Sequence, residues 1–240
     1  MWTPDLLAGV AEGERRALAA VLARDEDGAP AEAARLALDR ALSLACAALA
    51  REPPSRPIAC AKGCSSCCIS KVLVTPPEAL RIADHLRATL DTEALAAVTA
   101  RIAAADDRAR GLTRARRFEE KIPCPLLAPD GSCSVHEVRP LVCAGWTSLD
   151  AGACKRHFAA EGEEGPSAPI YGLGYELATA ILAGLVQACA DAGLDGSLLE
   201  LIAALRVALT RPTATERWRK RLPVFALARD EETARRLAGG

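Results

Sequence analysis

Four thiols fall within the nine residues Cys60-Ala61-Lys62-Gly63-Cys64-Ser65-Ser66-Cys67-Cys68. Four more of the chain's ten cysteines follow, at Cys124, Cys133, Cys143 and Cys154. Isolated cysteines often serve only as small buried apolar residues, but a cluster this dense is typical of a functional centre. Thiolates are the ligands that zinc, copper(I) and iron–sulfur clusters prefer, so these eight cysteines predict a metal centre.

A straight helix cannot bring the first four thiols to one zinc ion. Each helical residue rises about 1.5 Å, so Cys60 and Cys68 would share a face but lie about 12 Å apart. A tetrahedral zinc ion needs its sulfurs within roughly 4.6 Å of each other. The segment must therefore turn, for which Gly63 gives freedom, or the thiols share a larger cluster, or they divide between two centres. Adjacent Cys67 and Cys68 favour a division, because neighbouring side chains diverge.

Composition favours a helical protein. The chain has 240 residues, half of them apolar, but aromatic residues make up only 3%. Much of the apolar content is alanine and leucine, which favour helices. We expect one mainly α domain over residues 1–240, in which helices enclose a cysteine-rich irregular insert with a small β-hairpin. The net charge of −1 gives no long-range attraction to nucleic acid or anionic membranes.

The sequence start, Met1-Trp2-Thr3-Pro4-Asp5, lacks the basic and apolar regions of an export signal. The longest apolar run, 177–190, contains Gln187 and is too short to cross a bilayer. We therefore expect a cytoplasmic protein with no membrane contact. In the cytoplasm, clustered cysteines more often bind metal or do redox chemistry than form structural disulfides.

Periodicity predicts N-terminal helices within residues 5–51, over 5–24 and 31–51. The second helix carries a core-facing apolar stripe, Leu38, Leu42, Ala45 and Leu49. Cys46 lies beside this stripe, so we interpret it as a packing residue.

After the first cysteines, residues 71–75 read as a short extended piece. Thr75-Pro76-Pro77-Glu78 is a capping box that begins a helix. Asp91 or Thr92 can cap the next helix, and Gly111 can end it.

The cysteine-rich core, residues 58–157, loses its periodicity from residue 121 onward. The turn Pro129-Asp130-Gly131 predicts a small hairpin that places Cys124 near Cys133. Pro140 can open a short helix that delivers Cys143.

C-terminal helices are predicted within residues 170–221, after a linker over 161–169. The ladder Leu177, Ile181, Leu185 and Cys189 makes Cys189 a core residue. Gly193 ends this helix, and Ser197 can cap another.

Two arginine-rich runs raise the question of nucleic-acid binding. The first contains Arg114, Arg116 and Arg117, and the second is Arg217-Trp218-Arg219-Lys220-Arg221. We interpret both as solvated helix surfaces, because such short runs are a weak nucleic-acid signal.

Eight thiols exceed the need of a single zinc ion. Two zinc ions, or one iron–sulfur cluster with spare thiols, fit the number better, and the C-x2-C spacing of Cys64 and Cys67 suits either. Four thiolates on Zn²⁺ leave a charge of about −2, which favours nearby cations. Six basic residues lie close in sequence to the cysteines: Lys62, Lys71, Lys121, Arg139, Lys155 and Arg156.

His136 lies between two cysteines and is a candidate ligand, whereas His157 is a weaker one and His85 reads as a helix-surface residue. The sequence contains no motif of nucleotide-binding proteins or hydrolases.

Three blocks together resemble a bacterial family of cysteine-cluster proteins described as zinc- or iron-chelating and often called YkgJ-like. They are Cys60-x3-Cys64-x2-Cys67-Cys68, Cys124-Pro125-Leu126-Leu127 and Cys133-Ser-Val135-His136-Glu-Val-Arg139-Pro140-Leu-Val-Cys143. The family often has an aromatic residue where this chain has Leu126, and arginine where it has Ala144.

The resemblance implies a cysteine-ligated metal centre, commonly taken as iron–sulfur, and the family includes flagellin lysine N-methylases. We expect an iron–sulfur protein that works in electron transfer or in protein modification, with a redox or protein-substrate partner. A zinc-binding structural module and a metal-chelating storage protein remain the alternatives, and nothing in the sequence decides whether the protein is an enzyme. The expected ligands are Cys60, Cys64, Cys67, Cys68, Cys124, Cys133, Cys143 and Cys154.

Overall fold

Helices form most of the protein, and the only sheet in the described residues is a small antiparallel one of two strands. This computed structural model describes residues 3–24, 26–160, 168 and 170–233. The mainly α fold predicted from composition is thus confirmed, with the cysteine-rich segments in the middle of the chain. Most of the predicted linker, 161–167 and 169, lies outside the described residues.

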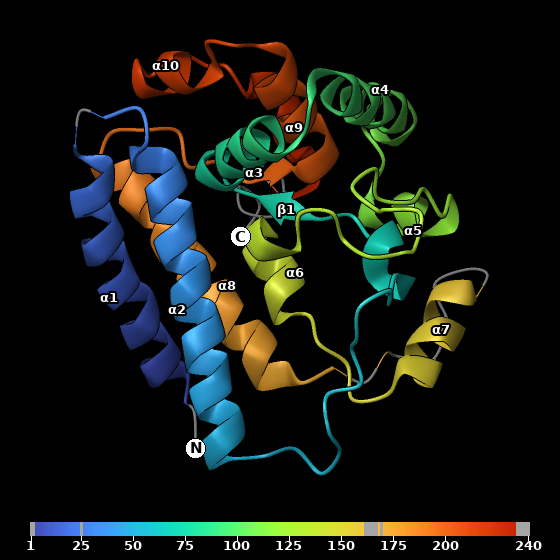
Figure 1. The fold of residues 1–240 in the computed structure, drawn as a ribbon. Helices are drawn as coiled ribbons and strands as arrows, with labels where there is room; N and C mark the ends of the chain where they lie inside the picture. The colour runs from blue at the N-terminus through green and yellow to red at the C-terminus, as the bar shows by residue number, and fades with distance from the viewer. Residues whose placement is uncertain (1–2, 25, 161–167, 169, 234–240) are drawn as a thin grey trace.

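Three helices form one side of the molecule, seen at the left of Figure 1. They are α1 (Pro4–Leu22), α2 (Ala29–Arg51) and α8 (Gly172–Asp191), and both α1 and α2 pack against α8. Close approach of α1 and α8 depends on Gly184, since a Cβ atom there would lie 2.6 Å from the carbonyl oxygen of Ala11.

The buried face of α2 is rotated from the predicted one. Leu38 is buried, but Leu42, Ala45 and Leu49 are only partly so. Alanines cover most of the buried face instead, at positions 33, 34, 37, 41 and 48. Small side chains let neighbouring helices come close. A prediction that looks for large apolar residues therefore misses a buried face made of alanines. Cys46 is exposed, so its interpretation as a packing residue was wrong.

The core ladder of α8 is confirmed, because Leu177, Ile181, Leu185 and Cys189 are all fully buried. The helix also begins earlier than the apolar run suggested. By length and composition it is the one helix in the described residues that could cross a membrane, although half of its most apolar window is buried inside the protein, as in a core helix.

A second helical group contains α3 (Pro76–Thr89), α4 (Thr92–Ala109), α9 (Leu201–Thr210) and α10 (Ala214–Arg219). The capping box at Thr75 and Glu78 is present, and Asp91 caps α4. Gly111 and Gly193 follow α4 and α8 with positive φ angles of 76° and 68°, as their stop roles require.

The sheet joins distant parts of the sequence. β1 (Leu73–Val74) pairs with β2 (Leu199–Glu200), with Leu73 opposite Glu200. Because residues 199–200 are a strand, α9 begins later than predicted, and its N-cap is Glu200 rather than Ser197.

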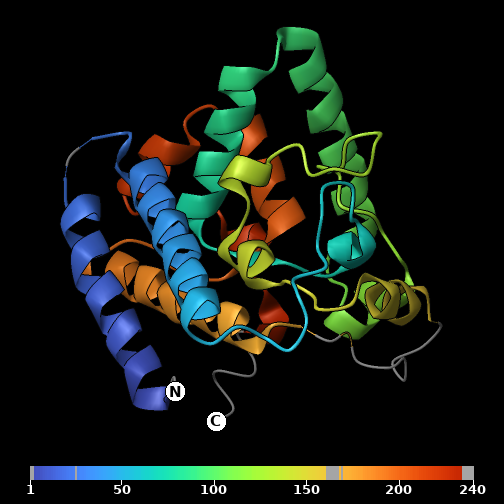
Figure 2. The ribbon, with the colours of Figure 1, turned by 60° about the horizontal axis from the view of Figure 1, so that its bottom comes forward.

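Short elements carry the cysteine-rich core: η1 (Ser66–Ile69), α5 (Arg114–Glu119), η2 (His136–Val138), α6 (Leu141–Gly145) and α7 (Ala151–Ala159), with η3 (Ala226–Ala228) near the C-terminus. Figure 1 shows α6 at the centre of the molecule, between the α1–α2–α8 group and η1. Figure 2 shows the connecting loops of this core together on one side of the fold.

The two basic runs are only partly solvated. Arg114 and Arg116 are exposed, but Arg117 has only 2% of its surface exposed. In the second run Trp218 is fully buried, and its Nε1 donates to the backbone oxygen of Asp195 at 2.8 Å.

Candidate metal centre

The first cysteine segment turns, as the distance argument required. Gly63 has a φ angle of +84°, and the amide of Cys64 donates to the oxygen of Ala61 at 3.0 Å. Cys67 and Cys68 follow in the single 3-10 turn η1. The four thiols therefore do not lie along one helix.

Cys67 and Cys68 do not diverge as expected. A hydrogen bond between their side chains is the largest cause that raises the pKa of Cys67, ahead of burial. Rotation about χ1 lets two neighbouring sulfurs meet even where their Cβ directions differ. The expected divergence of these two side chains is therefore not seen, and a division of the thiols between two centres stays a prediction.

The predicted approach of Cys124 and Cys133 is confirmed, because the charge of the Cys133 thiol raises the pKa of Cys124. The hairpin itself is reduced to one isolated bridge between Leu127 and Cys133. Each thiol accepts a hydrogen bond from the amide two residues later, Leu126 for Cys124 and Val135 for Cys133. Such N–H donors stabilise the thiolate form that binds metal.

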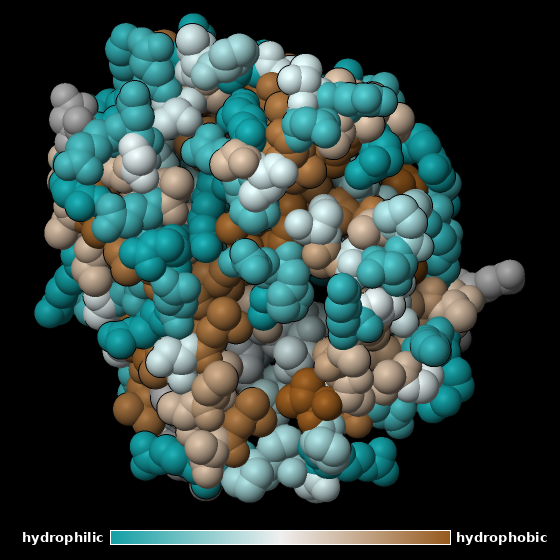
Figure 3. All heavy atoms as spheres, in the orientation of Figure 1, coloured by the Kyte–Doolittle hydropathy of each residue, from teal (hydrophilic) through white to brown (hydrophobic). Residues whose placement is uncertain are grey.

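Cys143 lies on α6, the short helix that follows Pro140 as predicted. Its side chain is exposed, yet the thiols of Cys124, Cys67 and Cys133 all act on its pKa, which burial raises well above the ordinary value. An accessible thiol surrounded by protein lines a concave surface. Figure 3, drawn in the orientation of Figure 1, shows the surface hollowed between α6 and η1.

Cys60 and Cys154 interact with a different set of thiols from Cys124 and Cys133. The amide of Ser148 lies 3.2 Å from the Cys60 sulfur and donates to it. The thiols of Cys64, Cys67 and Cys154 raise the pKa of Cys60 further, after burial. Cys154 is buried on α7, which packs against η1.

These neighbours define two groups of thiols. The outer group is Cys60, Cys64 and Cys154, and the inner group is Cys124, Cys133 and Cys143. The Cys67 thiol raises the pKa of Cys60 and also those of Cys133 and Cys143. Cys67 is therefore shared between the two groups. Within the described residues, no three Cys, His, Asp or Glu side chains are close enough to hold a single ion, so the ligand set stays a prediction.

The protein surroundings disfavour free thiolates in the inner group. Burial raises the pKa of Cys124 to about 11, and it also raises the pKa of Cys133. A bound metal cation reverses this preference and deprotonates its thiol ligands.

Among the six cations named from the sequence, Arg139 is the one that acts on the thiols, since it lowers the pKa of Cys133. The others are engaged elsewhere or exposed. Lys71 pairs with Asp230, and Lys121 lies 3.6 Å from the centre of the Phe118 ring. Lys62 is exposed and lies 4.0 Å from Asp130, while Lys155 and Arg156 are exposed on α7.

The contacts of His136 and His157 are with side chains other than the cysteine thiols. His136 is exposed, and its Nδ1 lies 3.2 Å from the Arg139 guanidinium. His157 packs against Phe118, with ring centres 5.4 Å apart. The ligand role of His136 stays a prediction.

Sequence reasoning missed Arg117, whose charge acts on Cys124. Its neighbours in sequence suggested only a solvated run, and no local signal distinguishes a buried arginine from exposed ones.

The donor chemistry of these residues suits a thiolate-bound metal, although the described residues bring no three such side chains within reach of one ion. Soft donors come from several separate segments, backbone amides donate to three of the sulfurs, and Arg117 and Arg139 supply positive charge beside them. Residues 59–158 match a family model named CxxCxxCC, which is described as a zinc- or iron-chelating domain without a choice between the two metals. No curated protein and no solved structure matches the chain.

Proposed function

Since residues 59–158 match the CxxCxxCC family model, we propose that the chain holds an iron–sulfur cluster on its cysteine thiolates. The proposed role is electron transfer, or the redox step of a protein-modifying reaction. The observation that supports it is that the thiols of Cys124, Cys67 and Cys133, which come from two other segments, all raise the pKa of Cys143 on α6. When bound, the cluster would supply one-electron chemistry.

The chain's own residues would tune the cluster through hydrogen bonds to its ligands and would supply the remaining thiolates. The amides of Ser148, Leu126 and Val135 donate to cysteine sulfurs, and such bonds are among the factors that set cluster potentials. Cys60, Cys64, Cys68 and Cys154 complete the proposed ligands, either for a second centre or as spare thiols.

The alternative is a zinc-binding structural module. The family description includes zinc, and thiolate donors suit zinc equally well. In that case the metal would fasten the short elements of the core, and no redox partner would be needed.

We further propose a cytoplasmic location and a protein partner, either a redox protein or a protein substrate. The free thiols suit a reducing compartment. The balanced charge supports neither nucleic acid nor a membrane as partner.

Anaerobic purification, followed by metal analysis, sulfide analysis and a visible spectrum on one sample, tests the proposal. We expect several irons per chain, acid-labile sulfide, and a broad visible absorption that bleaches on reduction. One or two zinc ions without colour would replace the proposal by the structural alternative. Variable, rapidly exchanging metal would indicate a storage protein, and a protein that takes up neither metal would overturn all three.

A further inference from the structure

Two loops that carry predicted metal ligands touch through their backbones at a pair of glycines. A Cβ atom on Gly131 would lie 3.2 Å from the carbonyl oxygen of Gly63, and a Cβ atom on Gly63 would lie 3.4 Å from the carbonyl oxygen of Asp130. Few real Cβ atoms come as close to another atom as 3.2 Å, so Gly131 is the tighter side of the contact. A side chain at Gly131 would therefore push the two loops apart.

Both glycines also adopt backbone conformations that other residues disfavour. The φ angle is +84° at Gly63 and +76° at Gly131. Gly63 immediately precedes Cys64, a thiol of the outer group, and Gly131 stands two residues before Cys133, a thiol of the inner group. The glycine contact therefore joins the loop of one group to the loop of the other, close to a thiol of each.

A second link joins the same two segments of the chain. The amide of Cys124 donates to the carbonyl oxygen of Cys68 at 2.7 Å. The loop around Gly131 is itself a defined turn, because its amide donates to the oxygen of Ala128 at 2.9 Å and the amide of Ser132 donates to Oδ1 of Asp130 at 2.9 Å. Segments 60–68 and 124–133 are thus joined through backbone groups at two separate points.

We propose that Gly63 and Gly131 are positioning residues of the metal centre, whose contact holds the loop of Cys64 against the loop of Cys133. This inference rests on the proposed metal centre and names what keeps its two groups of thiols together. Since neither glycine has a side chain, the loops meet backbone to backbone, and their spacing depends on both glycines. Residues that orient metal ligands affect metal affinity almost as strongly as the ligands do, so wider spacing should weaken metal retention.

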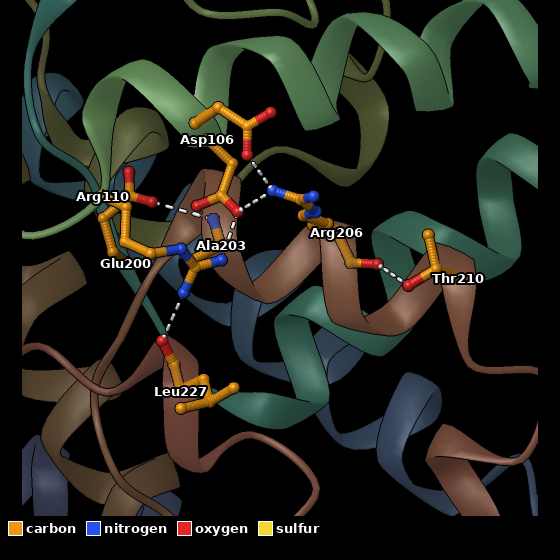
Figure 4. Close-up of polar contacts among 8 residues, drawn as sticks. Asp106, Arg110, Glu200, Ala203, Arg206, Thr210 and Leu227 are labelled. Carbon is orange, nitrogen blue, oxygen red and sulfur yellow. Dashed lines mark hydrogen bonds and ion pairs between the residues drawn. The ribbon is translucent and has the colours of Figure 1, made fainter.

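Gly111 provides a matched control for Gly131. Its φ angle of +76° equals that of Gly131, but a Cβ atom there would meet no atom of the described structure within 4 Å beyond its chain neighbours. Gly111 follows Arg110, the C-cap residue of α4, whose side chain binds Asp106 and the backbone oxygen of Leu227 (Figure 4). Substitution strains the backbone similarly at both glycines, but only at Gly131 does it disturb a cysteine loop.

The test compares Gly131→Asn with Gly111→Asn, because asparagine tolerates a positive φ angle better than most residues. Each full-length protein is loaded with Co²⁺, whose thiolate-bound form absorbs light, and its release to excess EDTA is followed. We expect Gly131→Asn to release cobalt about tenfold faster than the wild type, whereas Gly111→Asn should match the wild type. The absorption per bound cobalt should also change in Gly131→Asn alone, since it depends on the geometry of the thiolate ligands.

Equal release rates in the two asparagine variants would overturn the positioning role. So would a metal-free Gly131→Asn protein that melts lower than the wild type but keeps the wild-type cobalt spectrum and release rate, because the contact would then serve only the fold. If Gly131→Asn does not fold, Gly131→Ala and Gly111→Ala decide by the same comparison. A wild-type protein that takes up no cobalt would instead refute the metal centre on which the inference rests.

Discussion

Cys67→Ser should remove bound metal more completely than any other single cysteine substitution, lowering the metal per chain by at least about tenfold. Cys67 acts on a thiol of the outer group, Cys60, and on two of the inner group, Cys133 and Cys143. A serine hydroxyl does not form the thiolate that soft metals require. Metal analysis after anaerobic purification measures the effect.

Two other cysteines provide controls for Cys67→Ser. Cys46→Ser changes an exposed side chain on α2 and should keep full metal content. Cys189→Ser places a hydroxyl in the core of α8, so it should lower stability without lowering the metal content of folded protein. Cys64→Ser should lower metal content, but less than Cys67→Ser. Equal metal in the Cys67 and Cys46 variants would refute the shared position of Cys67.

Local signals predicted the helices well, because their causes are local. The capping box at Thr75 and Glu78 satisfies backbone groups within one turn, and Gly111 adopts a positive φ angle that other residues disfavour. The ladder that ends at Cys189 follows from helical periodicity alone. These features need no knowledge of the rest of the fold.

The missed features depend on contacts between distant segments. β2 exists because Leu199 and Glu200 meet β1, more than a hundred residues earlier, and neither strand has two full repeats of an alternating pattern. Arg117 is buried although Arg114 and Arg116 on the same helix are exposed, so its burial depends on the surrounding fold. The alanine face of α2 depends on how the neighbouring helices α8 and α3 pack against it, which the sequence of α2 alone does not reveal.

The sequence predicted that the site consists of metal-binding thiols, but it did not predict which thiols form a group. Thiol spacing indicated a metal and the turn at residues 129–131 brought Cys124 to Cys133, as expected. The sequence could not show that Cys67 influences thiols of both groups, because that depends on how segments distant in sequence are placed in the fold.

Glu78→Ala should lower the free energy of unfolding by about 3 kcal/mol, since it leaves several buried hydrogen-bond donors without their acceptor. Glu78 Oε2 accepts from the amide and the hydroxyl of Thr75 at 2.8 and 2.9 Å. Its Oε1 accepts from the amide of Leu141, the first residue of α6, at 2.9 Å. The same carboxylate thus caps α3 and fixes the helix that carries Cys143. Urea unfolding of the metal-free protein measures the loss of stability.

The matched control for Glu78→Ala is Asp91→Ala. Asp91 caps α4 through one bond, to the amide of Ala94 at 2.8 Å, so its loss should cost about 1 kcal/mol. Asp91→Ala should leave metal release to EDTA unchanged, whereas Glu78→Ala should speed it several-fold by freeing α6. Gly145 offers the competing explanation, because a Cβ there would lie 2.6 Å from the Cβ of Ala178 on α8. If Glu78→Ala lowers stability but not metal retention, contact with α8 rather than the Glu78 cap positions Cys143.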